Sequence, residues 1–221
     1  MKTVIGLAGV KTSGKSTVAY MMHEFINAKE VALADKLKNV CANIFNLDRK
    51  QFDVQELKEV PFNTPRELTI EVIKKCLEGF NITLSEELLE KYTKSGIINM
   101  QLETPRKIVQ IIGTEVLRMA GDEDIHCKNA MLSPEGITIV TDLRFPNEFD
   151  YFNNSEDINF IPIHVQRDEA ENLVTKDSHP SETSVFKFTD KCIKINNNGS
   201  FLDTELQVRN ILNEHIHNKE N

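Results

Sequence analysis

The sequence predicts an α/β fold in which a five-stranded parallel sheet is flanked by helices. Three observations carry this prediction. A glycine-rich loop directly follows an apolar first strand, further apolar runs suit strands buried on both faces, and helical stretches alternate with those runs. At 221 residues the chain is long enough to bury the core of one such domain.

Five short runs are predicted as strands because most of them are almost continuously apolar, as strands covered on both faces should be. These runs are Thr3–Ala8, Glu30–Ala34, Ile137–Thr141, Phe160–Gln166 and Lys191–Asn196.

Helices are predicted between the strands from apolar residues that recur every three or four positions. The predicted helices are Ser16–Asn27, Asp35–Phe45, Arg66–Phe80, Ser85–Thr93, Arg106–Ala120 and Leu202–His217. Ser200 and Asp203 suit a capping box at the start of the last helix. Strands that alternate with helices indicate a doubly wound sheet with right-handed crossovers.

The whole chain, residues 1–221, is predicted as one domain with a helical insertion at about 48–103. This interval is charged, helical or loop-like, and contains no convincing strand. Two interpretations stay open for it. The insertion is either an acceptor-binding lobe or a structural helical hairpin, which could also serve as a dimer surface.

The loop from Gly9 to Ser16 reads GVKTSGKS and matches the pattern G-x-x-x-x-G-K-[ST] in full. A strand, this loop and a helix together cradle phosphate, because backbone N–H groups and the helix N-terminus face the anion. Lys15 would reach the β- and γ-phosphates and the Ser16 hydroxyl would hold Mg²⁺. The fold is therefore predicted to be that of a P-loop NTPase. The predicted ATP-phosphate set is Gly9, Lys11, Thr12, Ser13, Gly14, Lys15, Ser16 and Thr17.

Charged residues are also predicted at the strand ends, where ligands bind in open α/β sheets. Asp142 ends the third predicted strand and would hold Mg²⁺ together with Ser16, unless it only caps the next turn. Arg144 follows it and could grip phosphate, or form a surface ion pair. Lys15, Asp142, Arg144 and Arg167 are the predicted catalytic residues.

The polar segment at about 167–183 follows the fourth predicted strand and is predicted to be a lid. Closure of a lid excludes water and favours transfer to an acceptor over hydrolysis. Arg167 at its start would stabilise charge on the transferring phosphoryl group. His179 and Glu182 are its other candidates, although His179 could equally be a solvated loop residue or one bonded to Glu182.

The predicted helix 106–120 carries a polar face in an otherwise apolar helix. Arg106, Gln110 and Gly113 share this face, which lines either a cleft or the outside of the domain. Asp35 and Lys38 place an acid and a base after the second strand, although Asp35 could simply cap its helix.

Composition and net charge limit the partners and the cellular location that we expect for this protein. With 26 basic and 34 acidic side chains the net charge is −8, which argues against a nucleic-acid polymer or a membrane surface as partner. No apolar run approaches the roughly 18 residues of a membrane span. The four cysteines show no metal-ligand spacing and suggest reduced thiols. We therefore expect a cytoplasmic enzyme, in the host cytoplasm if the protein is viral.

Taken together, these segments resemble the bacteriophage deoxynucleoside monophosphate kinases, a branch of the P-loop nucleoside monophosphate kinases. The resemblance rests on Gly9–Thr17, Leu33–Lys38, Thr104–Glu115, Asp142–Glu148 and His179–Glu182, and it is loose between Asp48 and Glu103. It implies ATP and Mg²⁺ as cofactors and a deoxynucleoside monophosphate (dNMP) as acceptor, with Asn198 and Gly199 near the adenine. The residues that it implies for the dNMP are Asp35, Lys38, Arg106, Gln110, Thr114, Glu115 and Arg118.

Two alternatives remain. The first is a kinase of a small hydroxyl acceptor, similar to dephospho-coenzyme A kinase, in which Asp35 would become the general base. The second is a nucleotide-dependent switch or assembly ATPase. A monophosphate oxygen is already anionic near neutral pH, so the dNMP reaction needs positioning and charge neutralisation rather than a strong base.

Overall fold

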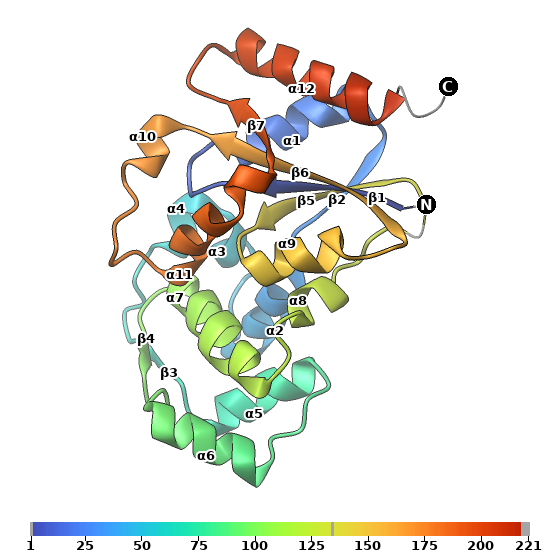
Figure 1. The fold of residues 1–221 in the computed structure, drawn as a ribbon. Coiled ribbons are helices and arrows are strands. Elements are labelled where there is room, and N and C mark those ends of the chain that lie inside the picture. Colours follow the sequence, from blue (N-terminus) through green and yellow to red (C-terminus); the bar gives the residue numbers. More distant parts are fainter. Residues whose placement is uncertain (1, 134, 218–221) are drawn as a thin grey trace. The chain divides into compact units, whose positions relative to one another are not determined.

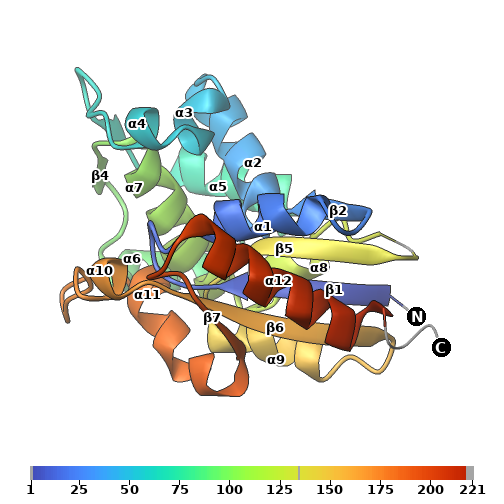
Figure 2. The same ribbon diagram turned by 90° about the horizontal axis from the view of Figure 1, so that it is seen from above.

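The computed structural model describes residues 2–133 and 135–217, and the chain divides into two compact units. The first unit comprises residues up to Leu33 and from Ala130 onward, and the second unit comprises Ala34–Asn129. The second unit therefore includes the predicted insertion at 48–103. Figures 1 and 2 show the ribbon in two orientations.

In the described part of the first unit, five parallel strands form one sheet in the order β2-β5-β1-β6-β7. The prediction of a five-stranded parallel sheet is confirmed. The strands are β1 (Lys2–Ala8), β2 (Ala28–Val31), β5 (Ile137–Leu143), β6 (Ile158–Gln166) and β7 (Ile193–Asn196). The central strand β1 lies between β5 and β6 (Figure 2), so the loop that follows it lies where the strand order reverses.

Helices cover both faces of this sheet. Figure 1 shows α1 (Lys15–His23) and α12 (Phe201–His215) on one face and α9 (Pro146–Asn153) on the other. Ile5 and Leu7 pack with apolar residues of α1 and α12, such as Met22 and Val208. In the described residues of this unit, the remaining helical segments are α10 (Asp168–Glu171), α11 (Pro180–Thr183) and two 3₁₀ turns (Ser184–Lys187 and Thr189–Lys191).

The other face of the sheet is packed with aromatic rings. The ring of Phe160 on β6 lies 5.6 Å from that of Phe149 and 5.6 Å from that of Phe152, both on α9. Gly6 makes room for this cluster, because a Cβ there would lie 2.9 Å from the Phe160 ring. The absence of a side chain at this position therefore leaves room for the ring beside the central strand.

The capping box predicted for the last helix is confirmed. The Ser200 hydroxyl accepts from the Asp203 N–H at 3.3 Å, and Asp203 Oδ2 accepts from the Ser200 N–H at 2.9 Å. The second strand was predicted at Glu30–Ala34 but ends earlier, at Val31. Beyond it the Leu33 N–H donates to the side chain of Asp142 on β5 instead of to a backbone carbonyl of that strand.

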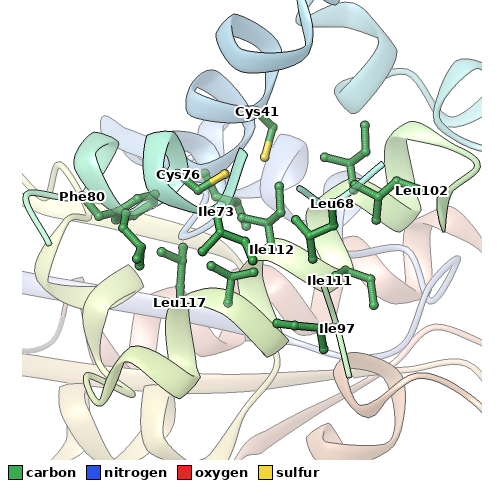
Figure 3. Packing of buried hydrophobic residues seen from close by; sticks show 14 of the residues in the cluster. Cys41, Leu68, Ile73, Cys76, Phe80, Ile97, Leu102, Ile111, Ile112 and Leu117 are labelled. Carbon is green, nitrogen blue, oxygen red and sulfur yellow. The ribbon is translucent and has the colours of Figure 1, made fainter. Parts of the chain in front are cut away.

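The second unit is mostly helical. Its elements are α2 (Asp35–Phe45), α3 (Lys50–Asp53), α4 (Gln55–Lys58), β3 (Arg66–Glu67), α5 (Ile70–Gly79), α6 (Glu86–Ser95), β4 (Gln101–Leu102), α7 (Pro105–Gln110), a π-helix (Ile111–Leu117), a 3₁₀ turn (Arg118–Ala120) and α8 (Ile125–Lys128). Its core gathers apolar side chains from several of these elements, as Figure 3 shows for Cys41, Ile73, Cys76 and Ile112.

Two sequence-based expectations for this unit were wrong. The first concerns the helix predicted at 66–80, which begins only at Ile70. The Thr69 hydroxyl accepts from the Val72 N–H at 3.2 Å and fixes the helix start there, while residues 66–67 pair with β4. The insertion therefore contains a short antiparallel pair of strands.

The second concerns the helix predicted at 106–120, which is α-helical only as far as Gln110. Residues 111–117 form a π-helix and residues 118–120 a 3₁₀ turn. The hydroxyl of Tyr92, a fully buried residue on α6, donates to the Val116 carbonyl at 2.8 Å and so binds one of the π-helical carbonyls. A π-helix has a wider turn than an α-helix, so residues beyond Gln110 do not continue the predicted face.

Candidate active site

The phosphate loop has the backbone conformation that its glycines allow. Gly9 and Gly14 have φ values of +148° and +100°, and the exposed Thr12 lies at +63°. A Cβ at Gly9 would lie 2.7 Å from both Ser13 Oγ and the Val165 carbonyl. Glycine is therefore required there for close packing as well as for the positive φ.

Lys15 folds back over this loop. Its Nζ donates to the carbonyls of Gly9 at 2.7 Å and Val10 at 2.6 Å. Ser16 and Thr17 follow in the first turn of α1, and both are exposed. The first N–H groups of a helix have no partner within the helix, so this turn offers donors and a positive dipole end to an anion. The residues present thus suit a triphosphate.

Asp142 lies on β5, the strand next to β1. Its Oδ1 accepts from the Leu33 N–H at 2.6 Å, which fixes the carboxylate near the carboxyl end of the sheet. A carboxylate and a serine hydroxyl are oxygen donors of the kind that Mg²⁺ takes alongside phosphate oxygens. Across residues 2–133 and 135–217, no group of three or more His, Cys, Asp or Glu side chains is placed to hold a metal.

Glu182 connects the predicted lid to the phosphate loop. Its Oε2 accepts from the Lys11 N–H at 2.8 Å, and its Oε1 accepts from Arg144 at 2.7 Å. Arg144 also donates to the Ser181 carbonyl at 3.1 Å. The buried Glu148 accepts from the Arg144 N–H at 2.8 Å and thereby fixes the backbone of that arginine.

The rest of the 167–183 segment follows β6. Arg167 donates to Glu169 at 3.0 Å, and its side chain is 44% exposed. His179 begins α11, where its Nδ1 accepts from the Ser181 N–H at 3.2 Å and lies 2.9 Å from the Ser181 hydroxyl. The imidazole of His179 thus bonds to Ser181, its carbonyl accepts from the Glu182 N–H at 2.8 Å, and the Glu182 carboxylate binds Arg144 and Lys11.

The turn between β7 and α12 holds the residues expected near adenine. The exposed Asn198 accepts from the Asp168 N–H at 2.9 Å, so this turn is bonded to the start of the 167–183 segment. A Cβ on Gly199 would lie 2.9 Å from Asp203 Oδ2, which explains glycine beside the capping box. Its neighbour Asn197, which the sequence analysis missed, contacts the phosphate loop itself.

In the second unit, Asp35 and Lys38 of α2 belong to a cluster of four charged groups whose other members are Arg49, just before α3, and Asp53 on α3. Asp35 accepts from Arg49 at 2.6 Å. Arg49 also pairs with Asp53, and Asp53 accepts from Lys38 at 3.1 Å. Sequence reasoning missed Arg49 and Asp53, because a charged residue in a polar stretch carries no signal of its own.

The other predicted acceptor residues lie on α7 and the segments after it. Arg106 Nε donates to Glu59 at 2.6 Å, and the Thr104 hydroxyl caps the helix by accepting from the Lys107 N–H at 3.1 Å. The α-helical part ends with Gln110, and the residues beyond it lie on the π-helix or the 3₁₀ turn. All five predicted residues are half-buried, namely Arg106, Gln110, Thr114, Glu115 and Arg118.

A phosphate loop after the central strand of a parallel sheet, with a carboxylate on the neighbouring strand, defines a nucleotide-binding protein of the P-loop class. The profile of the deoxynucleotide monophosphate kinase family matches residues 3–208, and the chain belongs to this family. It is similar to a putative deoxynucleotide monophosphate kinase of Acanthamoeba polyphaga mimivirus, with 26% identity over 222 residues that cover 93% of each chain.

It is also similar to a deoxynucleoside-5'-monophosphate kinase of Escherichia phage T5, with 22% identity over 215 residues that cover 84% of this chain and 86% of the relative. The family and the kinase activity predicted from the sequence are thus confirmed. Neither alternative, the hydroxyl-acceptor kinase or the switch ATPase, is favoured.

In the described residues, no helix has both the length and the apolar character needed to cross a bilayer.

Proposed function

We propose that this protein transfers the γ-phosphoryl group of ATP to a deoxynucleoside monophosphate and releases ADP and a deoxynucleoside diphosphate. The observation that carries the proposal is the conformation of the phosphate loop in a member of this family. Its glycines adopt positive φ values, and Lys15 Nζ lies over the loop within 2.7 Å of two backbone carbonyls. An ammonium in that place can exchange carbonyl oxygens for phosphate oxygens without a change of fold.

The phosphate loop is proposed to bind the triphosphate through its N–H groups and Lys15. Ser16 and Asp142 are proposed to hold Mg²⁺, directly or through its waters. When bound, Mg²⁺ would supply positive charge that neutralises the charge developing on the phosphate oxygens. Lys15 supplies a second positive charge from the protein itself. The proposed phosphate-binding residues are Gly9, Lys11, Thr12, Ser13, Gly14, Lys15, Ser16 and Thr17.

Arg144 and Arg167 are proposed to stabilise charge on the transferring phosphoryl group. Both are held by carboxylates in this structure, Arg144 by Glu182 and Arg167 by Glu169. A phosphoryl group would take the place of these carboxylates, because a guanidinium binds both kinds of anion with the same geometry. Segment 167–183, with His179 and Glu182, is proposed as the lid.

The acceptor is proposed to bind to the second unit, with insertion 48–103 contributing to the choice of base. Its charged groups are already ordered by ion pairs, for example Arg106 with Glu59. The acceptor phosphate is an anion, so guanidinium and ammonium groups can bind it, while Asp35 would orient the acceptor or a metal-bound water rather than act as a base. The proposed set is Asp35, Lys38, Arg106, Gln110, Thr114, Glu115 and Arg118.

The proposal also covers the adenine site, the oligomeric state and the cellular location of the protein. Asn198 and Gly199 are proposed to lie near the adenine of ATP. A homodimer through the insertion is a hypothesis that light scattering would test. The viral origin of both similar kinases favours the host cytoplasm as the place of action.

The proposal is tested by measuring ADP release from ATP with a panel of the common NMPs and dNMPs. We expect ADP release that depends on a dNMP and is lost in Lys15→Met. The matched control is Lys29→Met, which removes an exposed lysine from β2 of the same unit and should retain activity. Asp35→Asn separates the acceptor types, because a hydroxyl acceptor would lose most of its rate whereas a monophosphate would lose little. Absence of dNMP-dependent ADP release would refute the proposal.

A further inference from the structure

Asn197 joins three segments of the first unit that are far apart in the sequence. Its Nδ2 donates to the Ser13 carbonyl at 2.8 Å, and its Oδ1 accepts from the Thr204 hydroxyl at 2.9 Å. Its backbone N–H donates to the Gln166 carbonyl at 2.8 Å. The orientation of the amide is fixed chemically, because a carbonyl oxygen only accepts and must therefore face the NH₂ group.

The contact with Ser13 sets the direction of a peptide group in the phosphate loop. A trans peptide is planar, so the Ser13 carbonyl and the Gly14 N–H point in opposite directions. When Asn197 binds the carbonyl on the side of the β7–α12 turn, the Gly14 N–H points to the other side. An N–H group that turns away from this bond can donate to an anion, whereas a carbonyl in its place would repel one.

Two further observations indicate that this contact is built into the fold. A Cβ on Gly14 would lie 2.1 Å from Asn197 Nδ2, so the amide occupies the space that any larger residue would need. Thr204, whose hydroxyl holds the other end of the amide, is fully buried on α12 and also donates to the Ser200 carbonyl at 3.3 Å. The amide is therefore clamped between a buried hydroxyl and the phosphate loop.

We propose that Asn197 is a positioning residue for the triphosphate, which holds the Ser13–Gly14 peptide with its N–H toward the phosphates. This inference rests on the proposed function, since it concerns the same ATP site. Asn197 acts through the loop backbone and makes no contact with the reacting atoms in the proposed role. Its loss should thus affect the donor nucleotide and leave the acceptor unaffected.

The test compares Asn197→Ala with the matched control Gln207→Ala. Gln207 is a residue on α12 whose side-chain amide accepts from the Asn196 N–H at 2.8 Å and donates to the Asn196 carbonyl at 3.0 Å, so it braces the residue next to Asn197. For Asn197→Ala we expect the Kd and the KM for ATP to rise roughly 2- to 13-fold, the change that loss of one hydrogen bond produces. The KM for the dNMP should stay at the wild-type value, and Gln207→Ala should change neither constant.

Two more variants change the two side-chain hydrogen bonds of Asn197 one at a time. Asn197→Asp keeps the acceptor for Thr204 but cannot donate to Ser13, so its ATP affinity should fall at least as far as that of the alanine variant. Thr204→Val removes the hydroxyl that holds the amide and should cause a smaller change in the same direction. If Asn197→Ala does not fold, the inference is tested by measuring the same constants for ATP and the dNMP on Thr204→Val.

The outcomes separate this inference from the function on which it rests. Wild-type affinity for ATP in Asn197→Ala, or an equal rise in the KM of both substrates, would overturn the inference while the wild-type protein remained an active kinase. A wild-type protein that binds no ATP would overturn the proposed function, and this inference with it. A selective loss of ATP affinity, with the nucleotide-free melting temperature close to that of Gln207→Ala, supports it.

Discussion

The stability of the first unit should depend on pH through His164, which lies on β6 directly beside Ala8 of the central strand. Its Nε2 is 3.1 Å from Glu171 Oε1, but the two atoms do not align for a hydrogen bond. Burial, and then the positive charges of Lys194 and Lys15, lowers the pKa of His164 from 6.5 to about 4. The imidazole is therefore neutral at pH 7 and resists protonation in the folded state.

The sign and the size of the effect follow from this shift. Below pH 6.5 the unfolded chain binds a proton at His164, whereas the folded chain binds one only near pH 4. The free energy of unfolding therefore falls as the pH falls through this window, by about 1.4 kcal/mol per pH unit. Between pH 7 and pH 4.5 we expect a loss of about 2–3 kcal/mol from this one group.

Glu171 acts in the opposite direction. Burial, and then the neighbouring Asp168, raises its pKa, so its proton is bound more readily in the folded state and adds stability as the pH falls. The substitution His164→Gln leaves Glu171 in place and removes only the histidine contribution. The difference between the two proteins in how their free energy of unfolding changes with pH therefore gives the contribution of the imidazole alone.

The assay is urea unfolding of wild type and His164→Gln at several pH values from 7 to 4.5. The wild type should lose about 2–3 kcal/mol more than the variant over this range, whatever the effect of the substitution at pH 7. His23→Gln, which removes an exposed histidine of the same unit, is the matched control. Parallel pH profiles for wild type and His164→Gln would refute the reasoning.

Two further predictions concern contacts that hold the proposed sites. Tyr92→Phe leaves the Val116 carbonyl in the π-helix without its buried donor, and should lower the free energy of unfolding by about 1–3 kcal/mol in urea titrations; an unchanged value would contradict the role given to this bond. Glu182→Gln weakens the charge-assisted bonds to Arg144 and to the Lys11 N–H, so trypsin should cut at Lys176 faster than in wild type. Equal cleavage rates would show that Glu182 does not hold the segment.

The features that sequence reasoning found are those with a local signal. The phosphate loop was predictable because two glycines, a lysine and a serine have fixed spacing between a strand and a helix. The sheet was predictable because strands buried on both faces are nearly continuously apolar. Helix α2 was predicted at Asp35–Phe45, the range that the structure gives, because its apolar residues recur regularly.

The features that sequence reasoning missed depend on contacts between residues that are far apart in the chain. Asn197 meets the phosphate loop across 184 positions, and Glu182 meets Lys11 across 171 positions. No local pattern encodes such contacts. The two-residue strands β3 and β4 are too short to show alternation, and the π-helix at Ile111–Leu117 shares the apolar spacing of an α-helix closely enough to hide the change.

The central claim is that this protein moves the γ-phosphoryl group of ATP to a dNMP, and direct label transfer tests it most closely. Wild type and Lys15→Met would be incubated with Mg²⁺, ATP labelled at the γ-phosphate and each of the four common dNMPs, and the products separated by chromatography. The account predicts labelled deoxynucleoside diphosphate from at least one dNMP in the wild type and none in the variant. Label found only as inorganic phosphate, or labelled diphosphate formed equally by both proteins, would contradict it.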